Sequence, residues 1–271
     1  MTEPVIPELE KKETALRGLL EGYGALVVAY SGGVDSSYLA DMAHEALGEN
    51  AHLLIADSPS IPRSELAEAR ALAEARGWRL RVVQTREFEN EEYLKNDGQR
   101  CYHCKSALFE MMAAYAAEHG VPFIAHGEIA DDALDPTRLG AVAARERRVV
   151  APLAEAGLGK ADIRALSRRR GLPTWDKPSF ACLSSRFPKG TRVVPEEVRR
   201  VEMAEECLRA LGFRQYRARH HGDLCRVEVD QDEIPRMLDP DIRERLVRTL
   251  NALGYRHVTL DLAGYRTGST A

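Results

Sequence analysis

Short apolar runs alternate with longer amphipathic runs through the first part of the chain. The apolar runs have the length of β-strands and comprise Ala25–Tyr30, Ala51–Ala56, Leu80–Gln84 and Pro122–His126. The longer runs have apolar residues at helical spacing and comprise Pro7–Glu21, Ser36–Leu47, Pro62–Arg76, Lys105–Glu118 and Lys160–Arg170. This alternation predicts an α/β fold with a doubly wound parallel sheet, in which ligands bind beyond the carboxyl ends of the strands.

The pattern changes near residues 180–194. The elements predicted beyond that point are a helix, two alternating strands joined by His221-Gly222-Asp223, further helix and a last strand, over Pro195–Leu211, Arg214–His220, Leu224–Asp230, Glu233–Leu253 and His257–Leu262. We therefore predict a nucleotide-binding domain of residues 1–185. A smaller α+β domain of residues 186–271 is expected to serve substrate binding and oligomerisation.

Charge and hydrophobicity narrow the class of protein. The 271 residues include 38 basic and 42 acidic side chains, a net charge of −4. Nucleic-acid binders more often carry a basic excess, so we expect no nucleic-acid partner. No apolar run approaches the ~20 residues of a membrane span, so we expect no membrane partner either. Met1–Glu13 is acidic and polar, unlike a signal peptide, which favours a cytoplasmic location.

A glycine turn joins the first predicted strand to its helix, with the sequence Ser31-Gly-Gly-Val-Asp-Ser-Ser37. Glycines let the backbone approach an anion closely, and the N–H groups of the following helix point toward it. No Gly-Lys-Ser/Thr follows, so the turn is not a Walker loop. Asp35 is instead suited to hold Mg²⁺ against phosphate oxygens. The candidate ATP ligands are Ser31, Gly32, Gly33, Asp35 and Ser36.

Ser31–Ser36 resembles the SGGxDS signature of the PP-loop ATP pyrophosphatases, an adenylating family that includes NAD and GMP synthetases and tRNA sulfur transferases. Gly127-Glu-Ile-Ala-Asp-Asp132 resembles the second signature of that family, Gly-Thr-Asn-x-x-Asp-Asp. The resemblance implies that ATP and Mg²⁺ are bound, and that AMP is transferred while pyrophosphate leaves. Asp131 and Asp132 are then candidates to order Mg²⁺ or the activated carboxylate.

Five cysteines in a cytoplasmic chain favour thiol or metal chemistry over a disulfide scaffold. Cys207 lies in an amphipathic helix and Cys225 in an alternating strand, so both are expected to be buried. Cys101 and Cys104 form a CxxC pair, which by itself is compatible with half of a zinc site, a redox pair or chance. Together with Cys182, three thiolates suit a [4Fe-4S] cluster with one iron open to a labile sulfide.

The segment Trp175–Arg186, which contains Cys182, closely resembles the cysteine segment of the ATP-dependent sulfur transferases called LarE. The resemblance implies that a carboxylate of pyridinium-3,5-biscarboxylic acid mononucleotide is adenylated and converted to the thiocarboxylate, with sulfur from Cys182 or from a cluster held by Cys101, Cys104 and Cys182. It also implies a homohexamer and a downstream nickel-insertion enzyme, because the product leads to the nickel-pincer cofactor of lactate racemase. Whether a cluster forms or Cys182 is sacrificed stays open.

Such a substrate needs cations beside the acyl adenylate and a fork of donors around its phosphate. Arg217 and Arg219 share one face of their strand by the two-residue period. An acid on the preceding helix is expected at Glu205 or Glu206. The predicted substrate-binding residues are Lys105, Ser185, Arg186, Glu205, Arg217 and Arg219.

Two other functions fit part of the pattern. A tRNA thiolase shares the PP-loop and the three cysteines, but it would be expected to have zinc-ribbon cysteine pairs and an appended RNA-binding domain. An amide-forming synthetase would adenylate a carboxylate for attack by ammonia, and its cysteines would be structural.

Overall fold

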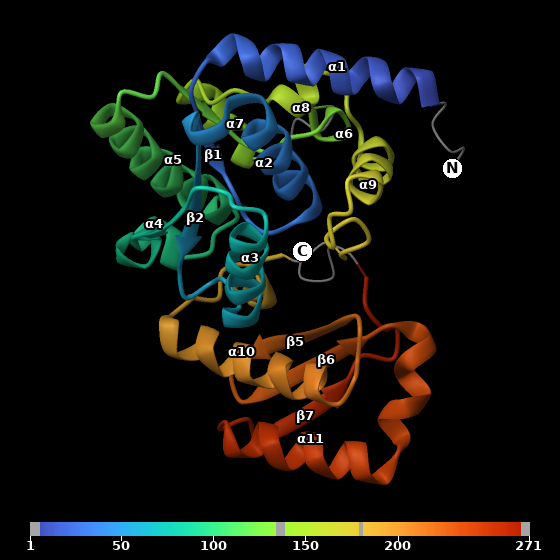
Figure 1. The fold of residues 1–271 in the computed structure, drawn as a ribbon. Helices are drawn as coiled ribbons and strands as arrows, with labels where there is room; N and C mark the ends of the chain where they lie inside the picture. The colour runs from blue at the N-terminus through green and yellow to red at the C-terminus, as the bar shows by residue number, and fades with distance from the viewer. Residues whose placement is uncertain (1–5, 134–138, 179–180, 267–271) are drawn as a thin grey trace. The chain divides into compact units, whose positions relative to one another are not determined.

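The computed structural model of the protein describes residues 6–133, 139–178 and 181–266. The chain divides into two compact units, one made of Met1–Glu87 and Cys101–Phe180 and the other of Phe88–Arg100 and Ala181–Ala271. Figure 1 traces the chain through both. No sequence pattern indicated that Phe88–Arg100 groups with the second unit. The functional division after residue 185 stays a prediction.

The first unit alternates strands and helices, as the hydrophobic pattern predicts. Its elements are α1 (Ile6–Tyr23), β1 (Leu26–Ala29), α2 (Val34–Leu47), the 3-10 helix η1 (Gly48–Asn50), β2 (Ala51–Asp57), α3 (Arg63–Ala75), β3 (Leu80–Gln84), α5 (Arg100–His119), β4 (Phe123–Ala125), α6 (Ala130–Ala133), α7 (Leu139–Glu146), α8 (Pro152–Glu155) and α9 (Lys160–Arg169). The strands form one sheet in the order β3-β2-β1-β4, and every pair is parallel. The predicted parallel α/β fold is confirmed.

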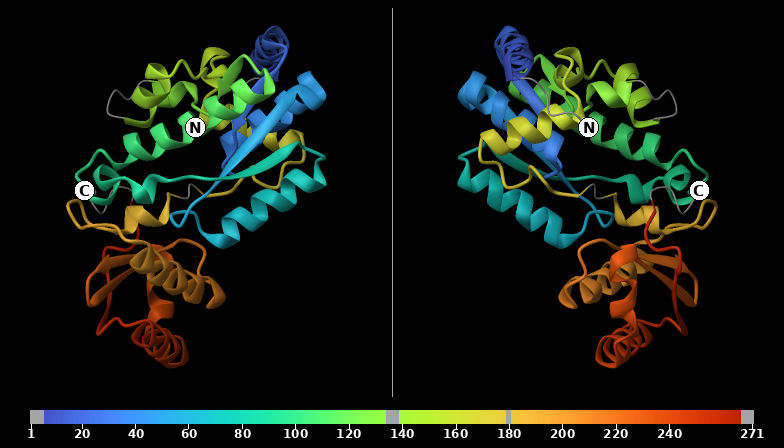
Figure 2. Two further views of the ribbon diagram at one scale, coloured as in Figure 1. Left: turned by 90° about the vertical axis from the view of Figure 1, so that its left-hand side faces the viewer. Right: turned by 90° about the vertical axis from the view of Figure 1, so that its right-hand side faces the viewer.

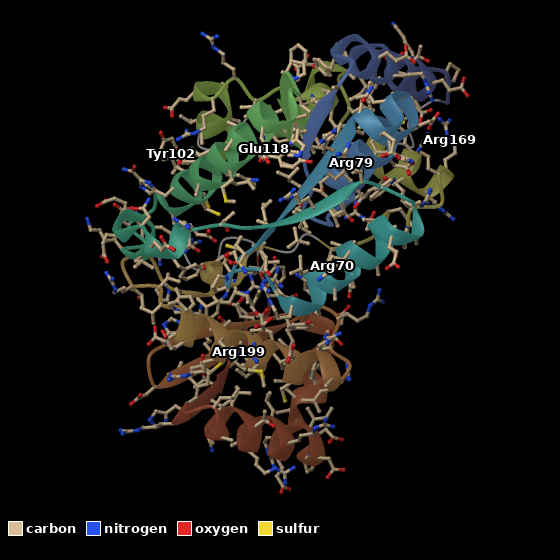
Figure 3. The ribbon with its side chains drawn as sticks, turned by 60° about the vertical axis from the view of Figure 1, so that its left-hand side comes forward. Arg70, Arg79, Tyr102, Glu118, Arg169 and Arg199 are labelled. Carbon is tan, nitrogen blue, oxygen red and sulfur yellow. The ribbon has the colours of Figure 1, made fainter. Side chains whose placement is uncertain are left out.

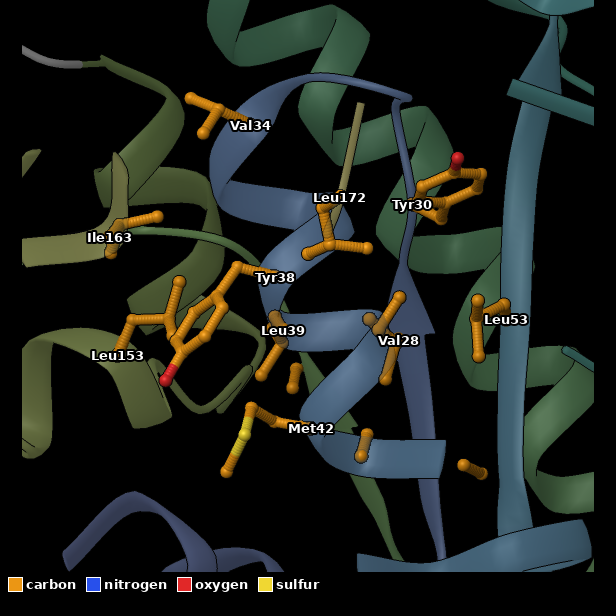
Figure 4. Close-up of a cluster of buried hydrophobic side chains, with 14 of the residues drawn as sticks. Val28, Tyr30, Val34, Tyr38, Leu39, Met42, Leu53, Leu153, Ile163 and Leu172 are labelled. Atoms are coloured by element: carbon orange, nitrogen blue, oxygen red, sulfur yellow. The ribbon is translucent and has the colours of Figure 1, made fainter. Parts of the chain in front are cut away.

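Helices cover both faces of this sheet. Successive side chains of a strand point to opposite faces, so each strand contributes to two separate cores. Val28 and Leu53 pack on one face among side chains of α1, α2, α3 and α9, including Leu39 and Met42 (Figure 4). On the other face, residues of β1 and β2 pack against α5 and α7. Figure 2 gives two side views of these layers. Each fully buried leucine of this core contributes roughly 1.5–3 kcal/mol, so the core fixes the strand ends that carry the site.

The second unit has its own small sheet. Its elements are η2 (Glu87–Glu89, which begins on the last residue of the first unit), α4 (Glu91–Leu94), η3 (Leu183–Arg186), α10 (Pro195–Ala210), β5 (Tyr216–His221), β6 (Leu224–Val229), η4 (Gln231–Leu238), α11 (Pro240–Ala252) and β7 (His257–Leu260). β5 and β6 form the predicted antiparallel hairpin, and β7 pairs in parallel with β6.

The helical prediction for Glu233–Leu253 is confirmed in two parts, since η4 ends at Leu238 and α11 begins at Pro240. A residue before proline is disfavoured in the helical conformation, and the Asp239 carboxylate caps the new helix by accepting hydrogen bonds from the N–H groups of Asp241 and Ile242. The helix predicted from Lys105 begins at Arg100. Within the described ranges, no helix combines the length and apolar character needed to cross a membrane.

Candidate active site

The turn between β1 and α2 is tightly constrained. Gly32 has a φ of +73°, and a Cβ atom at this position would lie 2.7 Å from the Cβ of Ala69, so the loop requires glycine here. The Ser36 hydroxyl accepts a hydrogen bond from the Ser31 N–H at 3.1 Å and donates one to the Gly33 carbonyl at 3.2 Å. These contacts hold the predicted ATP-binding residues at the N-terminus of α2, where N–H groups and the helix dipole favour an anion.

The loop after β4 packs against the same helix end. A Cβ atom on Gly127 would lie 3.2 Å from the backbone nitrogen of Ser36. Asp131 accepts a hydrogen bond from the backbone N–H of Lys160 at 2.7 Å. Gly159 leaves room for this carboxylate, since a Cβ there would lie 2.9 Å from the Asp131 Oδ1. The segments with the two family signatures therefore meet, and Asp131 is engaged by the start of α9.

The two carboxylate oxygens of Asp35 have different surroundings. Oδ2 accepts a hydrogen bond from the Lys160 Nζ at 2.5 Å. Oδ1 is buried and has no hydrogen-bond partner among the described residues. Burial raises the pKa of Asp35, Lys160 opposes this, and the charge of Asp132 adds to it. A buried carboxylate oxygen without a hydrogen-bond donor, beside the glycine turn, fits a Mg²⁺ ligand.

Lys160 is a site residue that the sequence reasoning missed. It is the first residue of α9, and its side chain is 42% exposed. The only signal in the sequence was a lysine at the start of a predicted helix. The cation that the glycine turn itself lacks thus comes from a residue 125 positions away.

His126, at the end of β4, was also missed. It is 8% exposed, and its Nε2 lies 3.1 Å from the Glu128 Oε2. Burial, with the nearby charge of Lys105, lowers the pKa of His126 to about 3. The ring is therefore neutral at physiological pH, and its contact with Glu128 is not an ion pair. The predicted substrate ligand Lys105 lies close to this end of the sheet, with its Nζ 5.8 Å from the centre of the Phe109 ring.

Cys101 and Cys104 lie near the start of α5, three residues apart, and so share one side of the helix. Cys101 is exposed and Cys104 is half-buried. Tyr102, labelled in Figure 3, donates a hydrogen bond to Glu146 at 2.6 Å. The CxxC pair thus lies at the N-terminal end of a long helix.

Cys182 lies in the second unit, directly before η3, and is half-buried. Its carbonyl accepts hydrogen bonds from the Ser185 N–H at 2.9 Å and from the Arg186 guanidinium at 3.0 Å. The same guanidinium nitrogen donates to the Ala181 carbonyl at 2.7 Å. The main chain that carries the thiol is therefore fixed from both sides of Cys182.

Arg186 is fully buried and forms a two-pronged ion pair with Glu205. The distances are 2.8 Å from Nε to Oε1 and 2.9 Å from the second terminal nitrogen to Oε2. Glu205 Oε1 also accepts the Ala218 N–H at 3.0 Å. Glu205 is buried whereas Glu206 is half-exposed, so Glu205 is the acid that faces this network.

Arg217 and Arg219 lie on one face of β5 and are 2% and 4% exposed. The Arg217 guanidinium lies 4.7 Å from the centre of the Tyr265 ring, and burial and the charge of Arg186 lower the pKa of Arg217. Arg219 donates to the Ser185 carbonyl at 3.1 Å and to Glu228 at 2.8 Å. The second unit thus gathers one set of predicted substrate ligands: Ser185, Arg186, Glu205, Arg217 and Arg219.

The cysteines divide between the units, with Cys101 and Cys104 in the first and Cys182 in the second. Among residues 6–133, 139–178 and 181–266, no group of three or more His, Cys, Asp or Glu side chains is placed to hold a metal ion. A cluster held by all three cysteines therefore stays a prediction. Thiolates are the donors that iron–sulfur clusters take, so the residue types fit.

Comparison with known proteins extends over nearly the whole chain. The NAD synthase family matches residues 8–103. The chain is 40% identical over 259 residues to an uncharacterized protein of Synechocystis sp., slr1717, covering 94% of this chain and 96% of that one. It is 34% identical over 262 residues to the pyridinium-3,5-bisthiocarboxylic acid mononucleotide synthase of Lactiplantibacillus plantarum, covering 96% of this chain and 94% of the synthase.

Proposed function

The chain belongs to the LarE family of PP-loop sulfur transferases, and on that basis we propose that it adenylates a carboxylate of pyridinium-3,5-biscarboxylic acid mononucleotide and converts it to the thiocarboxylate. The observation that carries the proposal is the pairing of Lys160 with Asp35, which lies in the first turn of α2 directly after the two glycines. A carboxylate for Mg²⁺ and a lysine for phosphate charge are what adenylation from ATP requires.

In the first step, a carboxylate oxygen of the substrate attacks the α-phosphorus of ATP, and pyrophosphate leaves. Ser31, Gly32, Gly33 and Ser36 hold the phosphates through N–H and hydroxyl donors. Asp35 Oδ1 supplies an oxygen ligand for Mg²⁺, which when bound withdraws charge from the phosphate oxygens. Lys160 then pairs with the departing pyrophosphate.

In the second step, sulfur replaces AMP. The Cys182 thiolate attacks the acyl carbon, and the bond from that carbon to the AMP oxygen breaks, which leaves a thioester. Cleavage between the cysteine Cβ and its sulfur, with loss of the Cα proton, then releases the thiocarboxylate and leaves dehydroalanine. In the multiple-turnover form of the proposal, Cys101, Cys104 and Cys182 would hold a [4Fe-4S] cluster, which would supply a labile sulfide in place of the cysteine sulfur.

The cationic residues bind the rest of the substrate. Arg217 and Arg219 take the mononucleotide phosphate, with Ser185 beside them, and Lys105 neutralises the acyl phosphate. Arg186 and Glu205 form an ion pair with each other and hold the other substrate-binding residues of the second unit in place. The gathering of three buried guanidinium groups, those of Arg186, Arg217 and Arg219, supports an anion here.

The proposal extends to the setting of the reaction. We take the enzyme to be a cytoplasmic homo-oligomer, a hexamer by family resemblance. Its product serves a downstream nickel-insertion enzyme in making the cofactor of lactate racemase. Membranes and nucleic acids have no part in this scheme. A tRNA thiolase would instead retain tRNA with a steep salt dependence.

The test is anaerobic purification followed by incubation with ATP, Mg²⁺ and the biscarboxylic mononucleotide. Mass spectrometry should detect the thiocarboxylate, with pyrophosphate and AMP formed in equal amounts. Cys182→Ala should abolish sulfur transfer, whereas Cys207→Ala, a buried control, should not. Iron and labile sulfide in the protein, with repeated turnover, support the cluster, while one turnover and dehydroalanine at position 182 support sacrifice. Turnover that persists in Cys182→Ala contradicts both forms.

A further inference from the structure

The segment that leads into the CxxC pair is fastened to the segment that follows Cys182. Both Phe88–Arg100 and the chain from Ala181 belong to the second unit. We infer that Arg100 and Asn96 are positioning residues that hold these two segments in register for sulfur transfer. The inference rests on the proposed function, because it assigns a purpose to the contact only if the cysteines act together.

Arg100 links the segments with one guanidinium nitrogen. That nitrogen donates to the Asn96 Oδ1 at 2.5 Å and to the Ser184 carbonyl at 2.8 Å. Arg100 directly precedes Cys101, and Ser184 is two residues beyond Cys182. One side chain thus joins a residue adjacent to the CxxC pair to a residue of the η3 turn that begins next to Cys182.

Asn96 is the centre of the contact. It is 4% exposed and has a φ of +53°, a conformation that asparagine tolerates better than most residues. Its side-chain amide donates to the carbonyls of Pro188 and Thr191 at 2.8 and 3.2 Å, and its own carbonyl accepts the Gly190 N–H at 2.8 Å. The side-chain amide of Asn96 thus both donates and accepts hydrogen bonds, and its main-chain carbonyl accepts another. These bonds hold the two segments together.

Apolar contacts and a hydrogen bond between hydroxyl groups also connect the two segments. Tyr93 and Ser184 share a hydrogen bond of 2.7 Å between their hydroxyl oxygens, and both residues are buried. The Val193 N–H donates to the Leu94 carbonyl at 2.9 Å, and Phe88 packs against the buried apolar cluster that includes Val193. Ser184 therefore receives contacts from two residues of the same segment, Tyr93 and Arg100.

The consequence concerns both cysteine-bearing stretches of main chain. Arg186 holds the carbonyls of Ala181 and Cys182, and Arg100 holds the carbonyl of Ser184. α5 begins at Arg100, so the same guanidinium anchors the first residue of the helix that carries Cys101 and Cys104. Arg100 touches no reacting atom in this scheme, and it acts through the backbone positions that it fixes.

The experiment compares Arg100→Gln and Asn96→Gly with a surface control, Arg192→Gln. Arg192 pairs with Glu91 between the same two segments, but the two side chains are 52% and 64% exposed. Three quantities are measured in the full-length protein: the alkylation rate of Cys182, the iron and labile sulfide bound after anaerobic reconstitution, and ATP–pyrophosphate exchange driven by the carboxylate substrate. Asn96→Gly keeps the positive φ, so it remains informative if Arg100→Gln does not fold.

Both test variants should change the Cys182 alkylation rate about tenfold and lower bound iron by a similar factor, as expected for loss of a charge-assisted hydrogen bond. Exchange should stay within about twofold of the wild-type value, as in Arg192→Gln, because the glycine turn is untouched. The inference would be overturned if both variants kept the wild-type Cys182 alkylation rate and the wild-type amount of bound iron. It would also be overturned if exchange fell by the same factor as these two quantities, because that result indicates a merely structural role. If the wild-type protein binds no iron, the cluster form of the proposed function fails, and the Cys182 alkylation rate alone decides the inference.

Discussion

Arg186 and Glu205 form a buried, two-pronged ion pair next to the residue proposed to deliver sulfur. The two hydrogen bonds measure 2.8 and 2.9 Å, and the side chains are 0% and 6% exposed. Burial alone would lower the pKa of Arg186, yet Glu205 raises it above its ordinary value. Arg186 also donates hydrogen bonds to the carbonyls of Ala181 and Cys182 and to the Ser185 hydroxyl. The pair therefore supports the Cys182 loop.

Replacing Arg186 with Met should destabilise the protein, because Glu205 would be left as a buried charge without its partner. Removing one member of such a pair typically costs about 3–5 kcal/mol. Urea unfolding monitored by circular dichroism gives the change in unfolding free energy.

The control is Arg199→Ala. Arg199, labelled on α10 in Figure 3, pairs with Glu202 at 3.5 Å and is 66% exposed. Its loss should change the unfolding free energy by no more than about 0.5 kcal/mol. A direct substrate role for Arg186 predicts the opposite result for Arg186→Met, namely a raised KM with stability unchanged.

Gly32→Ala should abolish adenylation. Its φ of +73° is strained for alanine, and the new Cβ would lie 2.7 Å from that of Ala69. ATP–pyrophosphate exchange should fall at least about a hundredfold, the scale of losing preorganised N–H donors. Gly22→Ala in α1 is the matched control, since a Cβ there meets nothing within 4 Å. Equal exchange in the two variants would mean that the turn does not bind ATP.

The strands of the first unit could be predicted because their signal is local. β3 spans Leu80–Gln84, the range that its apolar residues predict, and β1 is buried on both faces, so it appears as one unbroken apolar run. The glycine turn is local as well, because a positive φ and a close contact at Gly32 both select glycine. Such features depend on neighbours in the sequence.

The missed features depend on partners far along the chain. Lys160 meets Asp35 across 125 residues, and Arg100 meets Ser184 across 84. No period or composition identifies such pairs, since a lysine at a helix start is ordinary. Arg186 was predicted from its position to bind substrate, whereas its full burial against Glu205 appears only once η3 and α10 are packed together.

Asp35→Asn should eliminate exchange without destabilising the fold at neutral pH. Burial raises the pKa of Asp35, so its ionised form is disfavoured in the folded state. A carboxyl group with a raised folded-state pKa stabilises the fold when protonated, and this contribution is lost as pH rises through the folded-state pKa. The wild-type protein should therefore lose stability relative to Asp35→Asn as pH rises through that range. Unfolding at several pH values tests this, and a variant less stable than wild type near pH 7 would contradict it.

Lys160→Met should lower the rate of exchange but leave ATP binding largely intact. Its Nζ pairs with Asp35, and we propose that it meets charge that develops on the departing pyrophosphate. The turnover number should fall about a hundredfold, with a smaller change in KM for ATP. Lys160→Arg keeps the charge and should recover part of the rate. If both variants raise only KM, Lys160 contributes to ground-state binding alone.

The five thiols should differ sharply in reactivity. Burial, with the charge of Glu205, raises the pKa of Cys225 to about 12, so roughly one Cys225 in ten thousand is a thiolate at pH 8. Cys101 is exposed at the start of α5 and should react first with iodoacetamide in the iron-free protein. Mass spectrometry of digested samples taken over time gives each rate, and urea should bring Cys225 to the rate of the others. If Cys225 reacts as fast as Cys101 in the folded protein, the second unit must open on the timescale of alkylation, and the network around Arg186 and Glu205 is not a fixed support for Cys182.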